Sequence, residues 1–247
     1  MEIRKIYSDL NDTLIVSPRG NSDLAIVHDI DKKYTGIFRY AVDQLSTVDS
    51  WETHVFRAFE SLGKFKVSEK DYYSVAEKVS EKITVPESVK KTFEKVSDDI
   101  TELITFTGSS KYISKLIVDK KLRPLIPEYV TIINLATELD VDENGIFTGK
   151  VKKIYGYNDR AEIVRKLRNN ESSIGIADNH NNLNLGMIKE STFGIFLSEN
   201  NSCDRQGNIF YARPHQLPIV VDHILREEST KKTSEELKIC KWIERCR

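Results

Sequence analysis

The sequence has few of the residues that cross-link a chain. It contains three cysteines among 247 residues, at positions 203, 240 and 246. Their spacing makes neither a disulfide framework nor a zinc site, so a reducing compartment is the simpler expectation. The first residues, Met1 to Lys5, also lack the apolar stretch of a secretion signal. We therefore expect a cytoplasmic protein.

Long apolar runs and an excess of one charge are missing as well. No run of 18 apolar residues occurs, which excludes a membrane-spanning helix. The 37 Lys and Arg residues nearly balance the 38 Asp and Glu residues, giving a net charge of −1. Without a strong field of one sign, neither nucleic acid nor a membrane is an expected partner. The oligomeric state is not indicated by the sequence.

Apolar residues make up 39% of the chain, which is enough for a buried core. Short apolar runs alternate with amphipathic segments along most of the sequence. We expect strands at 3–7, 102–106, 130–135, 174–177 and 193–197, with a turn at Asn144-Gly145. Strands that alternate with helices predict an α/β fold with a Rossmann-like parallel sheet flanked by helices.

The stretch from about 17 to 83 has a different pattern. Apolar residues recur there at helical spacing, for example Val55, Phe59 and Leu62, and the segment looks almost entirely helical. It follows the first expected strand and precedes the rest of the alternating pattern. The length therefore divides into an α/β core interrupted by a helical insertion. A further charged helix is expected at 234–247.

Three expected strands each end in a polar cluster. The clusters are Asp9 to Thr13, Thr107 to Ser109, and Asp178 to Asn182. In open parallel sheets, ligands bind outside the carboxyl ends of the strands, so these clusters should converge. Two carboxylates, from Asp9 and Asp178, suit a hard cation such as Mg²⁺. Thr107-Gly108-Ser109 precedes a helix, where hydroxyl and N–H groups favour an anion.

Each cluster also has an ordinary structural explanation. An aspartate after a strand is commonly a turn or cap residue, and Thr-Gly-Ser before a helix is commonly an N-cap. Asp178 and the asparagines after it also suit a plain loop. Strand end, chain order and residue type nevertheless agree at three places, which favours a functional site.

The segments that carry these clusters resemble the motifs of the haloacid dehalogenase-like (HAD) hydrolases. Residues 6–14, Ile-Tyr-Ser-Asp-Leu-Asn-Asp-Thr-Leu, resemble the first motif, D-x-D-G-T after a strand. Residues 103–109 resemble the second motif, a strand ending in Thr or Ser, and 174–185 resemble the fourth, G-D-x-x-N-D-L. Residues 142–151 resemble the segment of the phosphoserine-phosphatase-like branch that reads N-G-x-x-T-G.

The resemblance covers residues 1–15 and about 84–200. The insertion between the first two motifs has the position of that family's helical cap. The resemblance therefore implies an α/β core formed by 1–15 and 84–247, and a mainly helical cap domain formed by 16–83.

The resemblance also implies roles for individual residues. Asp9 holds the position of a nucleophile that forms an aspartyl-phosphate with a small phosphorylated metabolite. Asp9, the backbone carbonyl of Asn11 and Asp178 hold the positions of the Mg²⁺ ligands. Thr107 is expected to bind the phosphoryl oxygens, helped by the backbone N–H groups of Gly108 and Ser109.

Four positions depart from the family pattern. Asn11 stands where an aspartate serves as general acid and base, and its loss lowers both half-reactions by about 10²–10⁴-fold. Asp12 stands where glycine is usual. Arg160 aligns with the position where the family has a lysine that stabilises the nucleophile and the phosphate. An arginine keeps the positive charge but has a different geometry. Asn182 replaces a second acid in the fourth motif.

These features leave two main functions open. The first is a Mg²⁺-dependent phosphatase weakened by Asn11. The second is a catalytically impaired binding or regulatory protein that retains the metal and phosphate pocket. A dehalogenase, which uses an aspartate nucleophile without metal, is disfavoured because Asp178 would have little purpose there.

Overall fold

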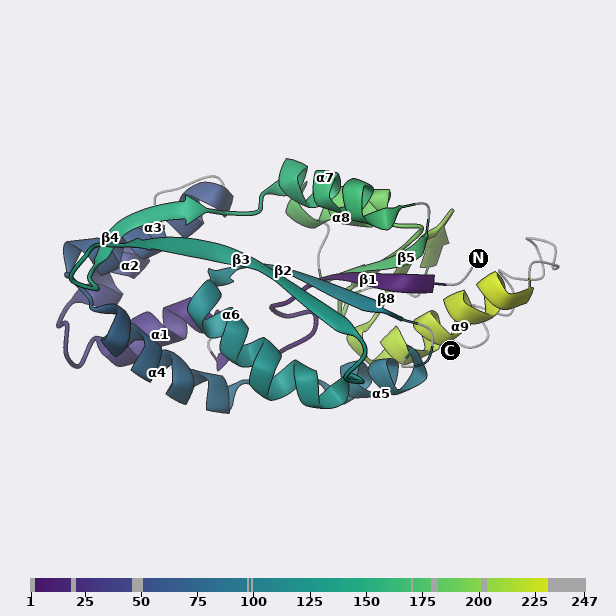
Figure 1. Ribbon diagram of the computed structural model, residues 1–247, viewed down its shortest axis with the longest axis horizontal. Helices are drawn as coiled ribbons and strands as arrows, with labels where there is room; N and C mark the ends of the chain where they lie inside the picture. Colours follow the sequence, from purple (N-terminus) through teal and green to yellow (C-terminus); the bar gives the residue numbers. More distant parts are fainter. Residues whose placement is uncertain are drawn as a thin grey trace.

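The computed structural model describes residues 3–18, 21–45, 51–96, 98, 100–169, 171–178, 182–200 and 204–230. Its centre is an eight-stranded sheet in the order β4-β3-β2-β1-β5-β6-β8-β7 (Figure 1). The pairs β3/β4 and β7/β8 are antiparallel and all others are parallel, so the predicted α/β fold is confirmed. The strands are β1 (Ile3–Asp9), β2 (Glu102–Ser110), β3 (Thr131–Val141), β4 (Phe147–Lys153), β5 (Ser172–Ala177), β6 (Phe193–Leu197), β7 (Asp204–Gln206) and β8 (Ile209–Ala212).

Helices cover both faces of the sheet. One face carries α7 (Tyr157–Arg168) and α8 (Asn182–Glu190), and the other carries α5 (Glu87–Val96), α6 (Lys111–Ile117) and α9 (Leu217–Thr230) (Figure 1). The central strand β1 is therefore apolar on both sides, as buried parallel strands are. Its Tyr7 packs with Val164 and Met187 of α7 and α8, and its Ile6 belongs to the cluster that contains Phe93 of α5.

Between β1 and α5 the chain forms four helices. They are α1 (Ser22–Ile30), α2 (Ile37–Leu45), α3 (Trp51–Lys64) and α4 (Glu69–Lys82), and they gather at one end of the molecule (Figure 1). The chain enters and leaves this segment at one point, because Val16 and Thr84 exchange backbone hydrogen bonds of 2.9 and 3.2 Å. This short bridge lies at the ends of the predicted insertion, residues 16–83.

The hairpin of β3 and β4 reaches out of the sheet and packs on α3. Its turn contains Asn144-Gly145, as predicted. The contact is close because two glycines face each other across it. A Cβ atom on Gly63 would lie 2.4 Å from the carbonyl oxygen of Thr148, and Gly149 has a φ of +81°. Gly63 lies within α3, and the break between α3 and α4 falls at 65–68.

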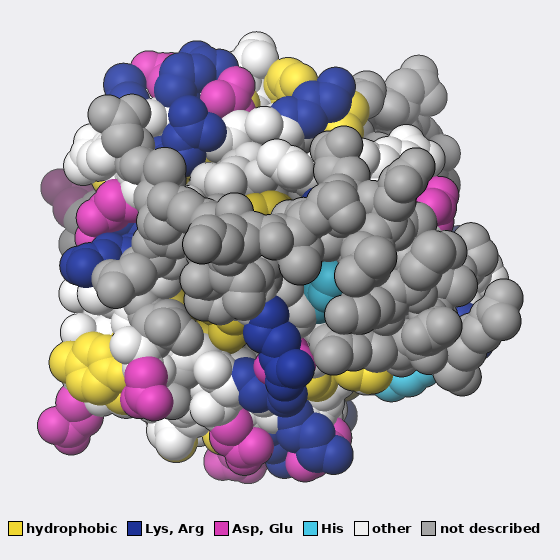
Figure 2. All heavy atoms as spheres, turned by 90° about the vertical axis from the view of Figure 1, so that its right-hand side faces the viewer, with side chains coloured by type: hydrophobic (Ala, Val, Ile, Leu, Met, Phe, Trp, Pro, Cys, Tyr) yellow, Lys and Arg dark blue, Asp and Glu magenta, His cyan; other side chains and the backbone are white. Residues whose placement is uncertain are grey.

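Charges of both signs alternate on the end of the molecule away from α1–α4. Figure 2 shows lysine and arginine side chains beside aspartates and glutamates on that face. Examples are the pairs of Lys95 and Arg226 with Asp222. None of the described helices is long and apolar enough to cross a bilayer. The helix expected at 234–247 lies outside the described residues.

Replacing Gly63 with alanine should destabilise the protein. At an exposed helical position alanine is favoured over glycine by about 1 kcal/mol. At Gly63 the added methyl group collides with the backbone of β4, so we expect the free energy of unfolding to fall by about 1–3 kcal/mol. Ser74→Ala at an exposed position of α4 is the control and should be neutral or slightly stabilising. Urea unfolding measures both, and an unchanged or raised stability of Gly63→Ala would contradict the close contact.

Candidate functional site

The described residues of the three predicted polar clusters lie at the carboxyl ends of the neighbouring strands β1, β2 and β5. Strands β1 and β2 are in register with Asp9 opposite Phe106, so Thr107 follows directly beyond that pair. On the other side of β1, Ser8 is opposite Ile176, so Asp178 follows β5 at the same edge. The parallel sheet thus brings together residues that are up to 169 positions apart, between Asp9 and Asp178.

Asp9 forms an ion pair with Arg160. An Nη1 atom of Arg160 donates to Oδ1 of Asp9 at 2.9 Å. The Arg160 side chain is 0% exposed and that of Asp9 is 13% exposed, so the pair is shielded from water. Asp178 also acts electrostatically on Arg160 and favours its charged form. Both carboxylates therefore act on one buried guanidinium.

Arg160 is fixed by three further contacts. Its Nε donates to the carbonyl oxygen of Tyr155 at 3.2 Å, and its Nη1 donates to Oδ1 of Asn184 at 2.6 Å. Its Cζ atom lies 5.4 Å from the ring centroid of Phe106. Helix α7 starts just before Arg160, where Asp159 accepts the N–H of Gly156 at 2.9 Å. Sequence reasoning missed Tyr155 and Asn184, because a loop carbonyl and a helical amide carry no motif signal.

Two opposing effects act on the protonation of Asp9. Burial raises the pKa of this carboxyl group, and the charge of Asp12 raises it further. The Arg160 guanidinium lowers the pKa by Coulombic attraction and by its hydrogen bond. Burial lowers the pKa of Arg160, and the nearby charge of Asp9 raises it. The ionised state of Asp9, which a nucleophile needs, therefore depends on Arg160.

Both polar atoms of the Asn11 side chain form hydrogen bonds. Its Nδ2 donates to the hydroxyl oxygens of Thr107 at 2.9 Å and Ser109 at 3.0 Å. Its Oδ1 accepts from the hydroxyl groups of Ser17 and Ser22, each at 3.4 Å. The amide is thus fixed between hydroxyl groups and offers no group that gains or loses a proton near pH 7.

Further hydrogen bonds lie in the segment around Thr107, next to Asn11. Thr107 Oγ1 also accepts the backbone N–H of Ser109 at 3.0 Å, and the Gly108 carbonyl accepts the Thr137 hydroxyl at 2.8 Å. Asp12 is exposed and has a φ of +56°, a conformation that glycine adopts without strain. This explains why glycine is expected at that slot. The side chain of Asn182 and residues 179–181 lie outside the described residues.

Asp23 is a functional-site neighbour that the sequence did not reveal. It lies in the first turn of α1 and is 6% exposed. Its Oδ1 accepts the Tyr72 hydroxyl at 2.5 Å, and both carboxylate oxygens lie 3.2 Å from the backbone nitrogen of Ser110. Burial raises its pKa, and hydrogen bonding from Tyr72, Ser110 and Ser109 lowers it. In the sequence, an aspartate in a first helical turn is typical of a surface cap.

The oxygen atoms available at this edge of the sheet are of the chemical type that binds a magnesium ion. Asp9 and Asp178 supply carboxylate oxygens and the Asn11 backbone supplies a carbonyl, which are the hard ligands that Mg²⁺ prefers. Both carboxylates act on Arg160, so they share one region of the sheet edge. Within the described part of the chain, no group of three or more His, Cys, Asp or Glu residues gathers as a metal site, and this edge offers two carboxylates and a carbonyl.

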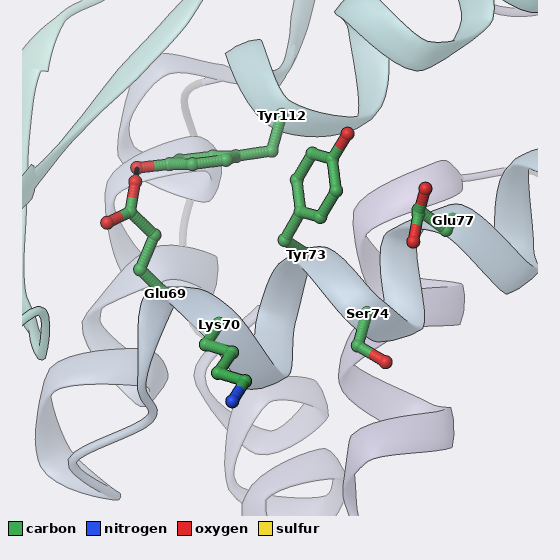
Figure 3. Close-up of a pocket in the computed structure, with 6 residues that line it drawn as sticks. All are labelled: Glu69, Lys70, Tyr73, Ser74, Glu77 and Tyr112. Atoms are coloured by element: carbon green, nitrogen blue, oxygen red, sulfur yellow. Dashed lines mark hydrogen bonds between the residues drawn. The ribbon is translucent and has the colours of Figure 1, made fainter.

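A hollow lies on the outer surface between α4 and α6. It has a volume of about 390 Å³ and is lined by Glu69, Lys70, Tyr73, Ser74, Glu77 and Tyr112 (Figure 3). The Tyr112 hydroxyl donates to Glu69 at 2.7 Å across it, and the two side chains point toward each other from the two helices. This contact ties α4 to the helix that follows Thr107–Ser110.

Several solved structures have a similar fold. A phospho-aspartyl intermediate analogue of phosphoserine phosphatase aligns with a TM-score of 0.55 and 16% identity, over 80% of this chain and 87% of that one. A phosphoserine phosphatase from T. onnurineus aligns with a TM-score of 0.55 and 12% identity, over 90% and 94%. A probable phosphoserine phosphatase from Vibrio cholerae gives 0.59 and 12%, over 94% and 67%.

No family model and no curated protein sequence matches the chain. The structural likeness, at 12–16% identity in these three cases, is a likeness of fold. The chain therefore has the HAD-like fold of the phosphoserine-phosphatase kind, and the expectation drawn from its motifs is confirmed at that level.

Removing Arg160 should leave Asp9 as an uncompensated buried charge. We expect Arg160→Met to lower the free energy of unfolding by about 3–5 kcal/mol. Asp9→Asn should relieve part of that loss, so the double variant should lose less than the sum of the two single variants. Arg165→Met, on the exposed side of the same helix, is the matched control and should change stability little. Additive losses at Asp9 and Arg160, measured by urea unfolding, would argue against a coupled pair.

Proposed function

We propose that the protein is a Mg²⁺-dependent phosphatase of a small phosphorylated molecule, with Asp9 as the nucleophile. The observation that carries the proposal is the buried pair of Asp9 and Arg160 beside Thr107, at the carboxyl edge of a HAD-like sheet. Asp9 attacks the phosphorus atom, the bond from phosphorus to the leaving oxygen breaks, and an aspartyl-phosphate is formed. Water then attacks that phosphorus and regenerates Asp9.

The neighbouring residues have distinct tasks in this proposal. Thr107 and the N–H groups of Gly108 and Ser109 bind the phosphoryl oxygens. Arg160 keeps Asp9 ionised and oriented, and its charge offsets part of the charge of the bound phosphate. Asp9, the Asn11 carbonyl and Asp178 would hold Mg²⁺. When bound, this ion supplies positive charge that stabilises the phosphoryl transition state.

The helical segment is proposed to act as a cap over the site. The chain enters and leaves this segment side by side, where Val16 and Thr84 are paired, and the β3–β4 hairpin and α6 also pack against α3 and α4. Ser17 and Ser22 at its start touch Asn11, so the segment begins inside the site. We place the division as predicted, with residues 16–83 as the cap and 1–15 and 84–247 as the core.

A second candidate function rests on Asn11. Its amide cannot take up or release a proton, and it is fixed by four hydroxyl contacts. This observation favours a binding or regulatory protein that recognises a phosphorylated molecule and does not turn it over. Such a protein would keep the oxygen donors and the phosphate loop, as this chain does.

The first test is phosphate release from a panel of phosphomonoesters with Mg²⁺. We expect turnover that a chelator removes and that falls to background in Asp9→Asn, because this variant has no nucleophilic carboxylate. Release that persists in Asp9→Asn would be a contaminant and would contradict the proposal.

The second test separates the two functions. Asn11→Asp fits its surroundings, because the hydroxyls of Thr107 and Ser109 can rotate to donate to a carboxylate. In a binding protein, the wild type is stabilised by Mg²⁺ plus vanadate without turnover, and Asn11→Asp gains activity by about 10²-fold or more over background. In a working enzyme, the wild type turns over and Asn11→Asp changes the rate much less. Thermal melting and phosphate release measure the two outcomes.

A further inference from the structure

The loop that is proposed to bind phosphate, Thr107–Ser109, is held from three directions. From the turn after β1, Asn11 donates to two of its hydroxyl oxygens at 2.9 and 3.0 Å. From β3, the Thr137 hydroxyl donates to its central carbonyl oxygen at 2.8 Å. The third contact comes from the helical segment and acts on Ser110, the residue that directly follows the loop. The position of the loop therefore depends on a part of the chain outside the sheet.

Asp23 makes the third contact. Both of its side-chain oxygens lie 3.2 Å from the backbone nitrogen of Ser110, whose N–H donates to them. Asp23 is in the first turn of α1 and is 6% exposed, and Ser110, the last residue of β2, is fully buried. A buried N–H group without an acceptor is costly in the interior of a protein. Asp23 therefore fixes the direction in which the chain leaves the loop.

Tyr72 of α4 holds Asp23 in this position. Its hydroxyl donates to Oδ1 of Asp23 at 2.5 Å and lies 3.0 Å from Oγ of Ser110. The Tyr72 ring is fully buried and packs edge-on against two rings, with centroids 5.8 Å from Tyr112 of α6 and 5.3 Å from Phe147 of β4. Because these rings fix the Tyr72 side chain, its hydroxyl stays directed at Asp23 and Ser110.

An ordinary role of Asp23 in its own helix does not account for these contacts. The N-cap of α1 is Asn21, whose side chain accepts the N–H of Leu24 at 3.0 Å. The hydrogen bonds of Asp23 are instead made to residues of α4 and β2. Among the described residues, no Lys, Arg or His pairs with it. The side chain thus serves the connection between the helical segment and the end of β2.

We propose that Asp23 is a positioning residue for phosphate binding, which keeps the Thr107–Ser109 loop ready for the phosphoryl group through the Ser110 N–H. Tyr72 keeps Asp23 in place. The proposal rests on the proposed role of this loop in binding phosphate. Donors that are already in place need no reorganisation when an anion arrives, whereas a loop that is ordered only on binding holds it more weakly. Asp23 acts through the loop and does not contact the phosphoryl group itself.

The test is the affinity for vanadate in the presence of Mg²⁺, measured by titration calorimetry at a temperature at which every variant is folded. We expect Asp23→Ala to raise the Kd of vanadate by about tenfold or more, because the Ser110 N–H loses its acceptor. Tyr72→Phe should raise the Kd less, since Asp23 still accepts that N–H.

The conservative variant Asp23→Asn should restore most of the affinity. Both oxygens of Asp23 lie equally far from the Ser110 nitrogen, so an asparagine still presents one oxygen to the N–H. It also keeps the size of the side chain, so the packing of α1 against β2 is largely unchanged.

Val79→Ala is the matched control for a loss of stability. Val79 is a buried core residue of α4, the helix that carries Tyr72, and its side chain forms none of these hydrogen bonds. Its truncation leaves a cavity, so the midpoint of urea unfolding should fall. The Kd of vanadate should stay unchanged, which separates a loss of stability from a loss of positioning.

Each outcome supports or overturns the proposal. An unchanged vanadate affinity in Asp23→Ala, or an equal weakening in Val79→Ala, would show a purely structural role and overturn it. Equal weakening in Asp23→Asn and Asp23→Ala would also overturn it, because the retained oxygen would then have no effect. Failure of the wild type to bind vanadate would overturn the phosphate loop and the positioning role together. Vanadate binding that follows the expected order without Asp9-dependent phosphate release would support the positioning role and overturn only the phosphatase.

Discussion

The arrangement of the site depends on one buried positive charge. Moving a guanidinium out of water costs several kcal/mol, so Arg160 is stable inside the protein only if its partners are in place together. Those partners come from four parts of the chain: Asp9 ends β1, Tyr155 precedes α7, Asn184 lies in α8, and Phe106 lies in β2. The charge therefore links the ends of two central strands to both helices of one face.

A second buried ionisable side chain, Asp23, connects the helical segment to the carboxyl edge of the sheet. Asp23 joins α1 to α4 through Tyr72 and to β2 through Ser110. Unlike Asp9, it pairs with no Lys, Arg or His among the described residues; burial raises its pKa, and the hydrogen bonds that it accepts lower it. The two aspartates are thus in different environments, one beside a guanidinium and one beside hydroxyl and backbone N–H groups.

The sequence predicted the parts of the fold that have strong local patterns. Strands β1, β2, β5 and β6 are continuous apolar runs, and their polar ends correctly indicated a common edge. Strands β7 and β8 were not predicted, because they are short and lie at one margin of the sheet, where β7 has no apolar residue. The close contact of Gly63 with β4 was also not predicted, because it depends on two segments far apart in the chain.

The candidate site was less predictable than the fold. Motif spacing indicated Asp9, Thr107, Arg160 and Asp178, since each follows or flanks a recognisable element. Asp23 had no such signal: its first-turn position is typical of exposed helices, and only the packing of α1 on β2 shows that it is buried. Hydrogen-bond networks between distant segments depend on tertiary packing, which periodicity does not report.

The amide of Asn11 is compatible with its neighbours for an electrostatic reason. Asp9 and Asp178 carry two negative charges and Arg160 carries one positive charge, so a third carboxylate would add repulsion before any cation binds. A neutral amide avoids this repulsion and still bridges Thr107 and Ser109. In the proposed phosphatase, the same neutrality would weaken the attraction for Mg²⁺.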